Sequence, residues 1–233
     1  SQRYRWPITG TVIFCGLQAA LIIGLLANRS QRKQAEAEAK LIAEISSKFV
    51  NLPPGEVDRE IMDAQRRICE SLGLDHAALW QWSDGAPGFF TLTHVYSAGD
   101  VPQPRAGMNS QEAFPWVQQQ MLAGRIVALS SLDDLPAEAA RDRQVAREMG
   151  VKSNLTIPLS VGGQPAVGAL GLNTLRTQRD WPDPLVKRLQ LVAQIFANAL
   201  ARTRADQALR ESELRLSLAT DSAGAGLWVL EWN

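Results

Sequence analysis

The 233-residue sequence has only two cysteines and two histidines. Cys15 falls in an uncharged apolar run and Cys69 in a predicted helix, so a disulfide-bonded scaffold is not indicated. His76 and His94 have no cysteine or histidine partner at metal-ligand spacing, so we predict no metal site. Acidic and basic side chains balance at 24 each, which gives no reason to expect a nucleic-acid partner.

Charged side chains are also missing from residues 8–27, where Gln18 is the only strongly polar residue of the interior. About 20 apolar residues in a helix span the hydrocarbon core of a bilayer. Tyr4 and Trp6 precede the run, where amphipathic rings favour the membrane interface. A signal peptide and a buried core helix are the alternatives, but a signal peptide usually has a shorter apolar stretch. We predict a transmembrane helix over 8–27, with 1–7 as the end of an upstream region, which the resemblance described below implies to be periplasmic.

Basic residues flank this run on both sides. Arg3 and Arg5 precede it, and more follow it: Arg29, Arg32, Lys33 and Lys40. The positive-inside rule therefore favours a cytoplasmic location for residues after about position 28, with the inner membrane and its lipid as surroundings. Residues 28–50 contain no proline or glycine and have apolar residues at helical spacing, which predicts a linker helix able to form a coiled coil.

A β-hairpin is predicted over Ser153–Asn173. Four apolar residues occupy alternate positions of its first half: Leu155, Ile157, Leu159 and Val161. The residues between them are mixed: Asn154, Thr156, Pro158 and Ser160. This period of two gives the strand one apolar and one mixed face. Gly162 and Gly163 supply the positive φ angles of a tight turn. Residues 166–173 are apolar on both faces, as in a central strand.

The segment between the linker helix and the hairpin alternates helical and strand patterns. Helices are predicted over residues 56–72, 111–122 and 136–149. Further strands are predicted over residues 76–82, 89–96 and 126–129. The expected fold class is therefore α+β, with a central antiparallel β-sheet flanked by helices.

A long helix is predicted to begin at Asp183-Pro184, because aspartate is a good N-cap and proline fits the first helical position. Its apolar residues recur at steps of three and four: Leu185, Leu189, Val192, Phe196 and Ala199. This near-heptad pattern predicts a helix that pairs with a second copy of the chain, as a parallel homodimer.

The hairpin sequence resembles that of a GAF domain. The resemblance covers residues 41–204 and rests on SNLTIPL at 153–159 and VGALGL at 167–172. Residues 205–218 resemble a signalling helix, and 219–233 look like the first strand of a PAS domain. The N-terminal segment is similar to the membrane helix of bacterial sensor histidine kinases, through Arg3, Tyr4, Arg5, Trp6, Gln18 and Arg29.

These resemblances imply a signal-relay portion of a membrane-bound sensor histidine kinase. Such a protein would autophosphorylate with ATP and act on a response regulator through a kinase core. No core is present here, because neither His76 nor His94 is followed by an acidic residue and no glycine-rich ATP lid occurs. We therefore predict no catalytic residues in this chain, which we expect to be a piece of a longer protein. A membrane diguanylate cyclase or phosphodiesterase, or a transcription regulator, is the alternative parent.

A GAF domain encloses a small-molecule pocket, and aromatic residues of this chain are the candidate lining. Strand parity places Trp80 with Trp82, and Phe90 with His94 and Tyr96, on common faces. The candidate ligand-binding residues are Trp80, Trp82, Phe90, His94, Tyr96, Met108, Phe114, Trp116 and Met121. Aromatic walls with few polar tips suit a small planar or apolar ligand. The alternative is that these residues simply fill the core.

None of the known ligand classes of the family fits by motif. Bilin-binding members need a cysteine near the pocket, and Cys69 lies on an early helix. Cyclic-nucleotide-binding members carry an Asn-Lys-Phe-Asp-Glu set, whereas Leu175 and Arg176 come shortly after Asn173 without a matching Phe-Asp-Glu. The several cysteines of the redox enzymes of the family are absent. The cofactor is therefore left unassigned.

Overall fold

The computed structural model of the chain describes residues 5–50, 52–82, 90–104 and 108–223. It divides into two units, Ser1–Ala43 and Glu44–Asn233. The first unit contains most of α1 (Arg5–Val50), which includes the predicted membrane and linker segments. Most side chains of residues 8–27 lie outside the described set. Among the helices of the described residues, none is both long and apolar enough to cross a membrane.

The second unit is built on a five-stranded sheet with the order β2-β1-β5-β4-β3. Its strands are β1 (His76–Trp82), β2 (Phe90–Ser97), β3 (Val127–Leu129), β4 (Ser153–Leu159) and β5 (Gly168–Thr174). Every pair of neighbours is antiparallel. The predicted central antiparallel sheet is therefore confirmed, and β5 lies at its centre.

The predicted hairpin is β4 and β5, joined by a glycine turn. Gly162 and Gly163 have φ angles of 58° and 75°, in the left-handed region that side chains disfavour. In the register of the pair Ile157 lies opposite Leu170, and both are buried. The alternation in the sequence thus gives β4 one apolar face and one mixed face on the other side of the sheet.

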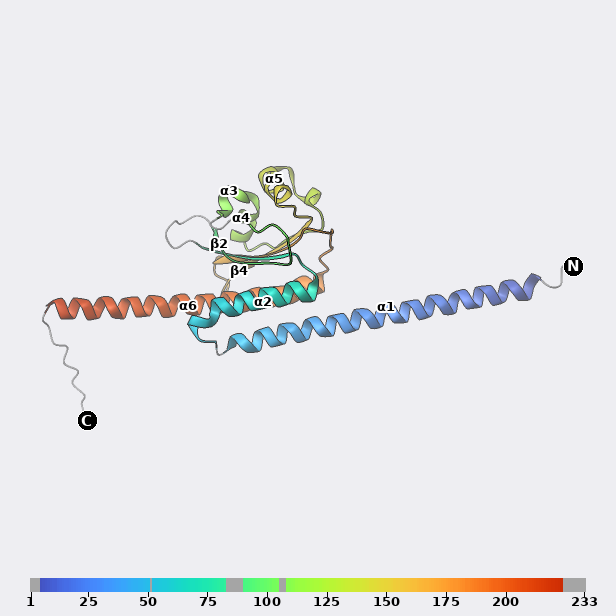
Figure 1. The fold of residues 1–233 in the computed structure, drawn as a ribbon, viewed down its shortest axis with the longest axis horizontal. Helices are drawn as coiled ribbons and strands as arrows, with labels where there is room; N and C mark the ends of the chain where they lie inside the picture. The colour runs from blue at the N-terminus through green and yellow to red at the C-terminus, as the bar shows by residue number, and fades with distance from the viewer. Residues whose placement is uncertain (1–4, 51, 83–89, 105–107, 224–233) are drawn as a thin grey trace, which may run out of the picture. The chain divides into compact units, whose positions relative to one another are not determined.

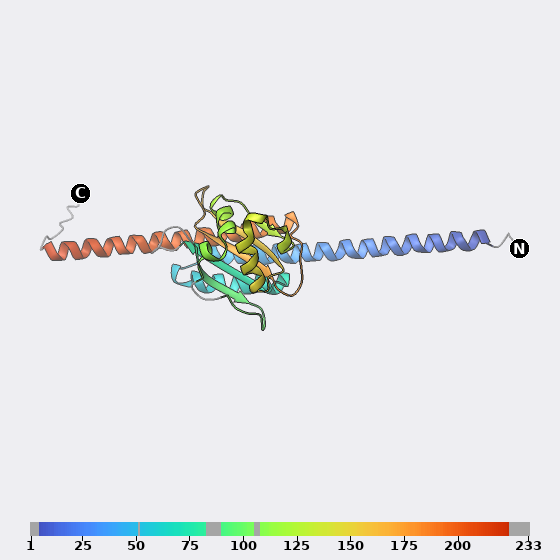
Figure 2. The same cartoon turned by 90° about the horizontal axis from the view of Figure 1, so that it is seen from above.

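Helices cover the two faces of the sheet unequally, as Figures 1 and 2 show. Two long helices lie along one face: α2 (Val57–Leu72) and α6 (Asp183–Ala223). Three short helices lie over the other: α3 (Ser110–Ala113), α4 (Pro115–Leu122) and α5 (Ala140–Glu148). Three 3-10 turns complete the unit: Pro54–Glu56, Leu132–Asp134 and Ala137–Ala139.

The helix predicted over 111–122 is divided into α3 and α4 at Phe114. This residue has φ −136° and ψ 59°, outside the helical region. Proline disfavours helical geometry in the residue before it, and Pro115 is the first residue of α4. The break makes a second helix N-terminus at Pro115, which matters for the site described below.

The residues predicted to pair two copies of the chain are all buried inside the second unit: Leu185, Leu189, Val192, Phe196 and Ala199. The Phe196 ring lies 5.5 Å from that of Phe49. The prediction that these five residues form a dimer interface is therefore wrong, because they are covered by other residues of the same chain. Apolar steps of three and four also arise when a helix packs on a sheet, and that is the packing here.

Beyond the sheet, α6 continues as an exposed helix. The residues from 207 to 219 are all exposed, including Leu209 and Leu214. Helical structure therefore extends through the predicted signalling segment 205–218 and ends at Ala223. The predicted PAS segment 219–233 is helical as far as Ala223, and the rest of it lies outside the described residues.

Cys69 is expected not to react with a maleimide at pH 8 in the folded protein. Its side chain is buried in α2, and burial, aided by the charges of Asp75 and Glu70, raises the pKa of its thiol to about 12. Only about one thiol in ten thousand is then ionised at pH 8. Peptide mass spectrometry, which separates Cys69 from Cys15, measures this directly. The urea-unfolded chain is the control and should label fully; labelling within minutes under native conditions would contradict the buried position.

Candidate functional site

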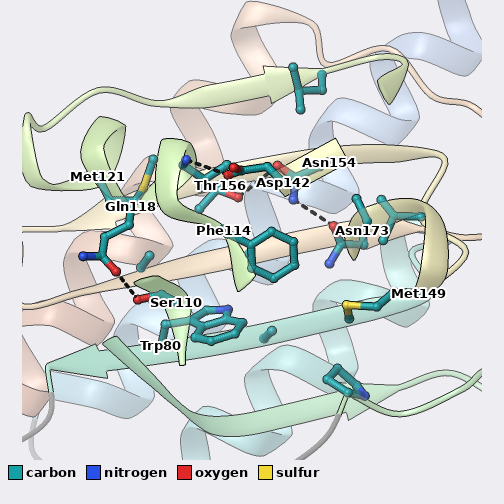
Figure 3. Close-up of a pocket in the computed structure, with 18 of the residues that line it drawn as sticks. Trp80, Ser110, Phe114, Gln118, Met121, Asp142, Met149, Asn154, Thr156 and Asn173 are labelled. Carbon is teal, nitrogen blue, oxygen red and sulfur yellow. Dashed lines mark hydrogen bonds between the residues drawn. The ribbon is translucent and has the colours of Figure 1, made fainter. Parts of the chain in front are cut away.

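A cavity of about 80 Å³ lies between the sheet and the short helices α3, α4 and α5. Figure 3 shows side chains from both layers pointing into it. Its volume is well below the roughly 300–1,000 Å³ of sites for drug-sized ligands. The cavity therefore suits a molecule of a few heavy atoms rather than a large cofactor.

Aromatic and aliphatic side chains form most of the cavity wall. Trp80 and Phe114 meet edge to face with ring centroids 6.0 Å apart. Phe90 lies beside them, and its ring is 5.2 Å from that of Trp82. The remaining apolar lining is Ala78, Pro104, Val117, Met121, Leu129, Leu132, Leu135, Ala146, Met149, Val151, Ala169 and Gly171. These walls favour an apolar ligand body.

A chain of hydrogen bonds crosses the sheet face of the cavity. The Thr156 hydroxyl donates to Asn154 Oδ1 at 2.9 Å, and Asn154 Nδ2 donates to Asn173 Oδ1 at 2.8 Å. All three residues line the cavity (Figure 3). The direction of the chain leaves the Asn173 amide nitrogen as its terminal donor. This polar strip is the mixed face of the hairpin, which is where the sequence placed Asn154 and Thr156.

Ser110 and Gln118 form a second polar pair on the helical side. The Ser110 hydroxyl donates to Gln118 Oε1 at 2.5 Å and accepts the Phe90 backbone N–H at 2.8 Å. Both side chains are buried and line the cavity. Because Phe90 begins β2, this pair ties the sheet to α3 and α4.

Asp142 is a carboxyl group in the apolar interior, with only 1% of the residue exposed. Its Oδ1 accepts the Val117 N–H at 2.9 Å and its Oδ2 the Trp116 N–H at 3.2 Å. These donors belong to the first turn of α4, which has no side-chain cap of its own. Burial raises the pKa of Asp142, and hydrogen bonds from the backbone N–H groups of Val117, Trp116 and Asp142 itself oppose the rise.

The structure brings together some of the predicted pocket residues and separates others. Trp80, Phe90, Phe114 and Met121 line the cavity. Trp82 and Trp116 pack against the same apolar cluster without lining the cavity. The other three are absent from its lining: His94, Tyr96 and Met108.

A β-bulge in β2 explains why the His94 side chain faces away from the cavity. Leu79 pairs with His94 but Trp80 pairs with Leu92, so Thr93 is an extra residue in β2. An extra residue reverses the side-chain alternation beyond it. His94 therefore faces α2, where its Nε2 lies 3.1 Å from Asp58 Oδ1. The parity that grouped His94 with Phe90 assumed an unbroken strand and was wrong.

Sequence reasoning missed the polar half of the site. Asp142 lies within the helix predicted over 136–149, but its burial follows from the packing of α5 on α4. Asn173 was considered only for a nucleotide motif. A signal for it was available, because Asn154 and Asn173 sit at corresponding ends of the two hairpin strands and pair in register.

The unfolding free energy is expected to fall on acidification from pH 7 to pH 5. Burial lowers the pKa values of His76 and His94 below 6.5, although Asp58 opposes this at His94. These two histidines therefore bind more protons in the unfolded chain than in the folded one, so the stability that they contribute is full above pH 6.5 and declines below it. The raised pKa of Asp142 acts in the opposite direction, so the histidine contribution is read from the difference between the wild type and the His94→Gln variant. Urea unfolding at several pH values measures the slope. His94→Gln should flatten it, and an unchanged slope would contradict this assignment.

Metal and thiol chemistry receive no support from the described residues. No three His, Cys, Asp or Glu side chains there cluster closely enough to hold a metal ion. Cys69 is in α2, on the face of the sheet opposite the cavity (Figure 1). It therefore cannot attach a pigment bound in the cavity.

Comparisons with known proteins agree with this fold. A family model described as GAF domain matches residues 57–200. The GAF domain of a phosphoenolpyruvate-protein phosphotransferase from Coxiella burnetii has a TM-score of 0.60 at 18% identity, covering 75% of this chain and 98% of that one. A free methionine-R-sulfoxide reductase from Neisseria meningitidis, solved with its substrate, has a TM-score of 0.58 at 14% identity, covering 74% and 93%.

A phycocyanobilin-bound GAF domain of a cyanobacterial phytochrome also has a TM-score of 0.58, at 13% identity, covering 72% of this chain and 96% of that one. No curated protein matches the sequence. Identities this low show a shared fold and leave the ligand of this chain to be argued from its own cavity.

Proposed function

Because the chain belongs to the GAF domain family, we propose that its second unit is a sensory domain that binds a small molecule in the cavity under α3, α4 and α5. The main support for this proposal is the composition of the cavity. Trp80 and Phe114 form aromatic walls, and Asn154 and Asn173 form a short polar strip. Few polar groups in an apolar wall are the usual composition of a small-molecule site.

The sheet is the proposed route from the cavity to α6. Along β4, Asn154 and Thr156 face the cavity. Leu155 and Ile157 are buried on the opposite face of the sheet, which α6 covers. A ligand that moves the strip on one face therefore displaces the packing of α6 on the other, because interiors are close-packed. Small shifts or rotations of such a helix are a common switching device.

Binding of n-butanol, used as a probe, tests whether the cavity is the site. We expect saturable binding to the full chain by calorimetry, and at least a tenfold loss in Ala146→Leu, which places extra methyl groups in the cavity. Ala140→Leu is the matched control, because Ala140 is an exposed residue of the same helix. If Ala146→Leu binds butanol as well as the wild type, the cavity is not the binding site. Mass spectrometry of an extract of the purified protein then searches for a retained natural ligand.

The parent protein we propose is a membrane-bound sensor histidine kinase, with a cyclase, phosphodiesterase or transcription regulator as the alternative. Support comes from the helices that enter and leave the domain, α1 and α6, and from the resemblance of the flanking segments to such kinases. The response regulator would be reached through a kinase core that follows the PAS segment. Sequencing the reading frame past Asn233 tests this proposal, because each parent would encode a different output domain there.

Membrane attachment through residues 8–27 is proposed from their lack of charge. After cell lysis we expect the full chain in the membrane fraction. We also expect it to stay there during extraction with alkaline carbonate, which removes peripheral proteins. A chain lacking residues 1–27 is the comparison. Equal recovery of both in the supernatant would contradict the proposal.

A parallel homodimer through α6 is proposed with a revised interface. Leu209 and Leu216 lie seven residues apart, so they share one face of the helix, and they are 60% and 63% exposed, beyond the part of α6 that packs on the sheet. Single cysteines at either position should crosslink two copies. Leu191, 58% exposed on the sheet-packed part of α6, is the control position. Crosslinking no better at Leu209 than at Leu191 would contradict this interface.

A further inference from the structure

We propose that the cavity selects a compact organic cation, such as a small primary amine, and that Asp142 is its anionic anchor. This inference rests on the proposed function, that the cavity binds a small molecule. Asp142 is the only ionisable side chain among the described residues that line the cavity. It is also almost fully buried, so its charge acts in a medium where electrostatic interactions are strong.

The contacts of Asp142 leave room for a ligand. Each carboxylate oxygen has two acceptor positions. The N–H groups of Trp116 and Val117 occupy one on each, and the backbone N–H of Asp142 itself occupies a third, which leaves one position for a ligand. The neighbouring arginines donate elsewhere: Arg141 to the Glu112 carbonyl, and Arg143 to the carbonyls of Leu132, Leu135 and Pro136. Within the described residues no cation forms an ion pair with Asp142, so an ammonium group would supply the missing charge partner.

The opposite wall fits the same ligand class. In Figure 3 the Phe114 ring lies between Asp142 and Trp80, and all three line one cavity. Aromatic faces attract cations through the negative charge of their π-systems, most strongly in tryptophan. The apolar remainder of the wall accommodates a short hydrocarbon body, and the small volume excludes a larger one.

A carboxylate ligand should be rejected by the same features. No lysine, arginine or histidine is among the described lining residues, so no positively charged side chain there offsets the charge of an anion. Asp142 would also repel it. The cavity therefore orders three molecules of equal chain length by charge: n-butylammonium first, n-butanol second and butyrate last.

Calorimetric titration of the wild-type full chain at pH 7 with these three probes tests the order. We expect n-butylammonium to bind at least tenfold more tightly than n-butanol, and butyrate not to bind measurably. Asp142→Asn should weaken butylammonium binding at least tenfold and change butanol binding less than threefold. Asparagine keeps one oxygen for the Val117 N–H, and circular dichroism with thermal unfolding checks the fold of the variant.

Asp133→Asn is the matched control, because Asp133 carries the same charge on the surface, 82% exposed and paired with Arg147. It should leave the order of the three probes unchanged. Equal binding of butanol and butylammonium to the wild type would overturn the inference while leaving the proposed binding function in place. Absence of binding by all three would overturn both. The wild-type comparison does not depend on the folding of Asp142→Asn.

Discussion

Replacing Gly168 with alanine is expected to destabilise the domain by about 3 kcal/mol or more. A Cβ atom on Gly168 would lie 2.2 Å from the Trp80 backbone carbonyl oxygen and 3.1 Å from Leu159 Cδ1. The oxygen belongs to the adjacent strand β1, so relief requires the β1–β5 pairing to open. Gly168 is the first residue of the central strand β5, which pairs directly with β1 and β4.

Gly171→Ala is the matched control on the same strand. Its Cβ would meet the Ala78 carbonyl oxygen at 3.8 Å and Thr156 Oγ1 at 4.0 Å, which are ordinary contacts. We expect this variant to unfold within about 1 kcal/mol of the wild type and to reduce the cavity by one methyl group. Urea unfolding followed by circular dichroism compares the two variants. A Gly168→Ala protein as stable as Gly171→Ala would show that β1 and β5 are not paired as described.

The sheet could be predicted because its signals are local. Alternation at Leu155 and Ile157, two turn glycines and an all-apolar partner strand are enough to identify a hairpin with β5 in the centre. The start of α6 at Asp183 was equally local, since Asp-Pro is an N-terminal signal by itself.

The site could be predicted only in part, because it depends on distant contacts. The apolar wall was found through aromatic residues such as Trp80, whose position follows from strand parity. The extra residue Thr93 can be recognised only from the register in which Leu79 and Trp80 pair with β2. Asp142 caps α4 from about 25 residues away in the sequence, and the residues next to Asp142 contain no motif that predicts this contact. A heptad-like pattern, in turn, does not distinguish a sheet from a second helix as the surface that covers Leu189.

Phe196→Ala is expected to lower the unfolding free energy of the full chain by about 3–5 kcal/mol. Phe196 is fully buried, and its ring packs against Phe49 at 5.5 Å. Truncation to alanine removes the transfer free energy of the ring and leaves a void between α6 and the end of α1. Leu191→Ala, an exposed change on the same helix, should cost less than about 0.5 kcal/mol.

The same pair of variants distinguishes a core residue from a dimer residue. If Phe196 paired two copies of the chain, its loss would dissociate dimers and leave the monomer folded. Because Phe196 is enclosed within one copy, we expect unfolding at lower urea concentrations, with the dimerisation of the remaining folded protein unchanged. Urea unfolding and light scattering on one set of samples measure both quantities. A folded, monomeric Phe196→Ala protein beside a dimeric wild type would show that the dimer interface includes Phe196 and lies away from Leu209 and Leu216.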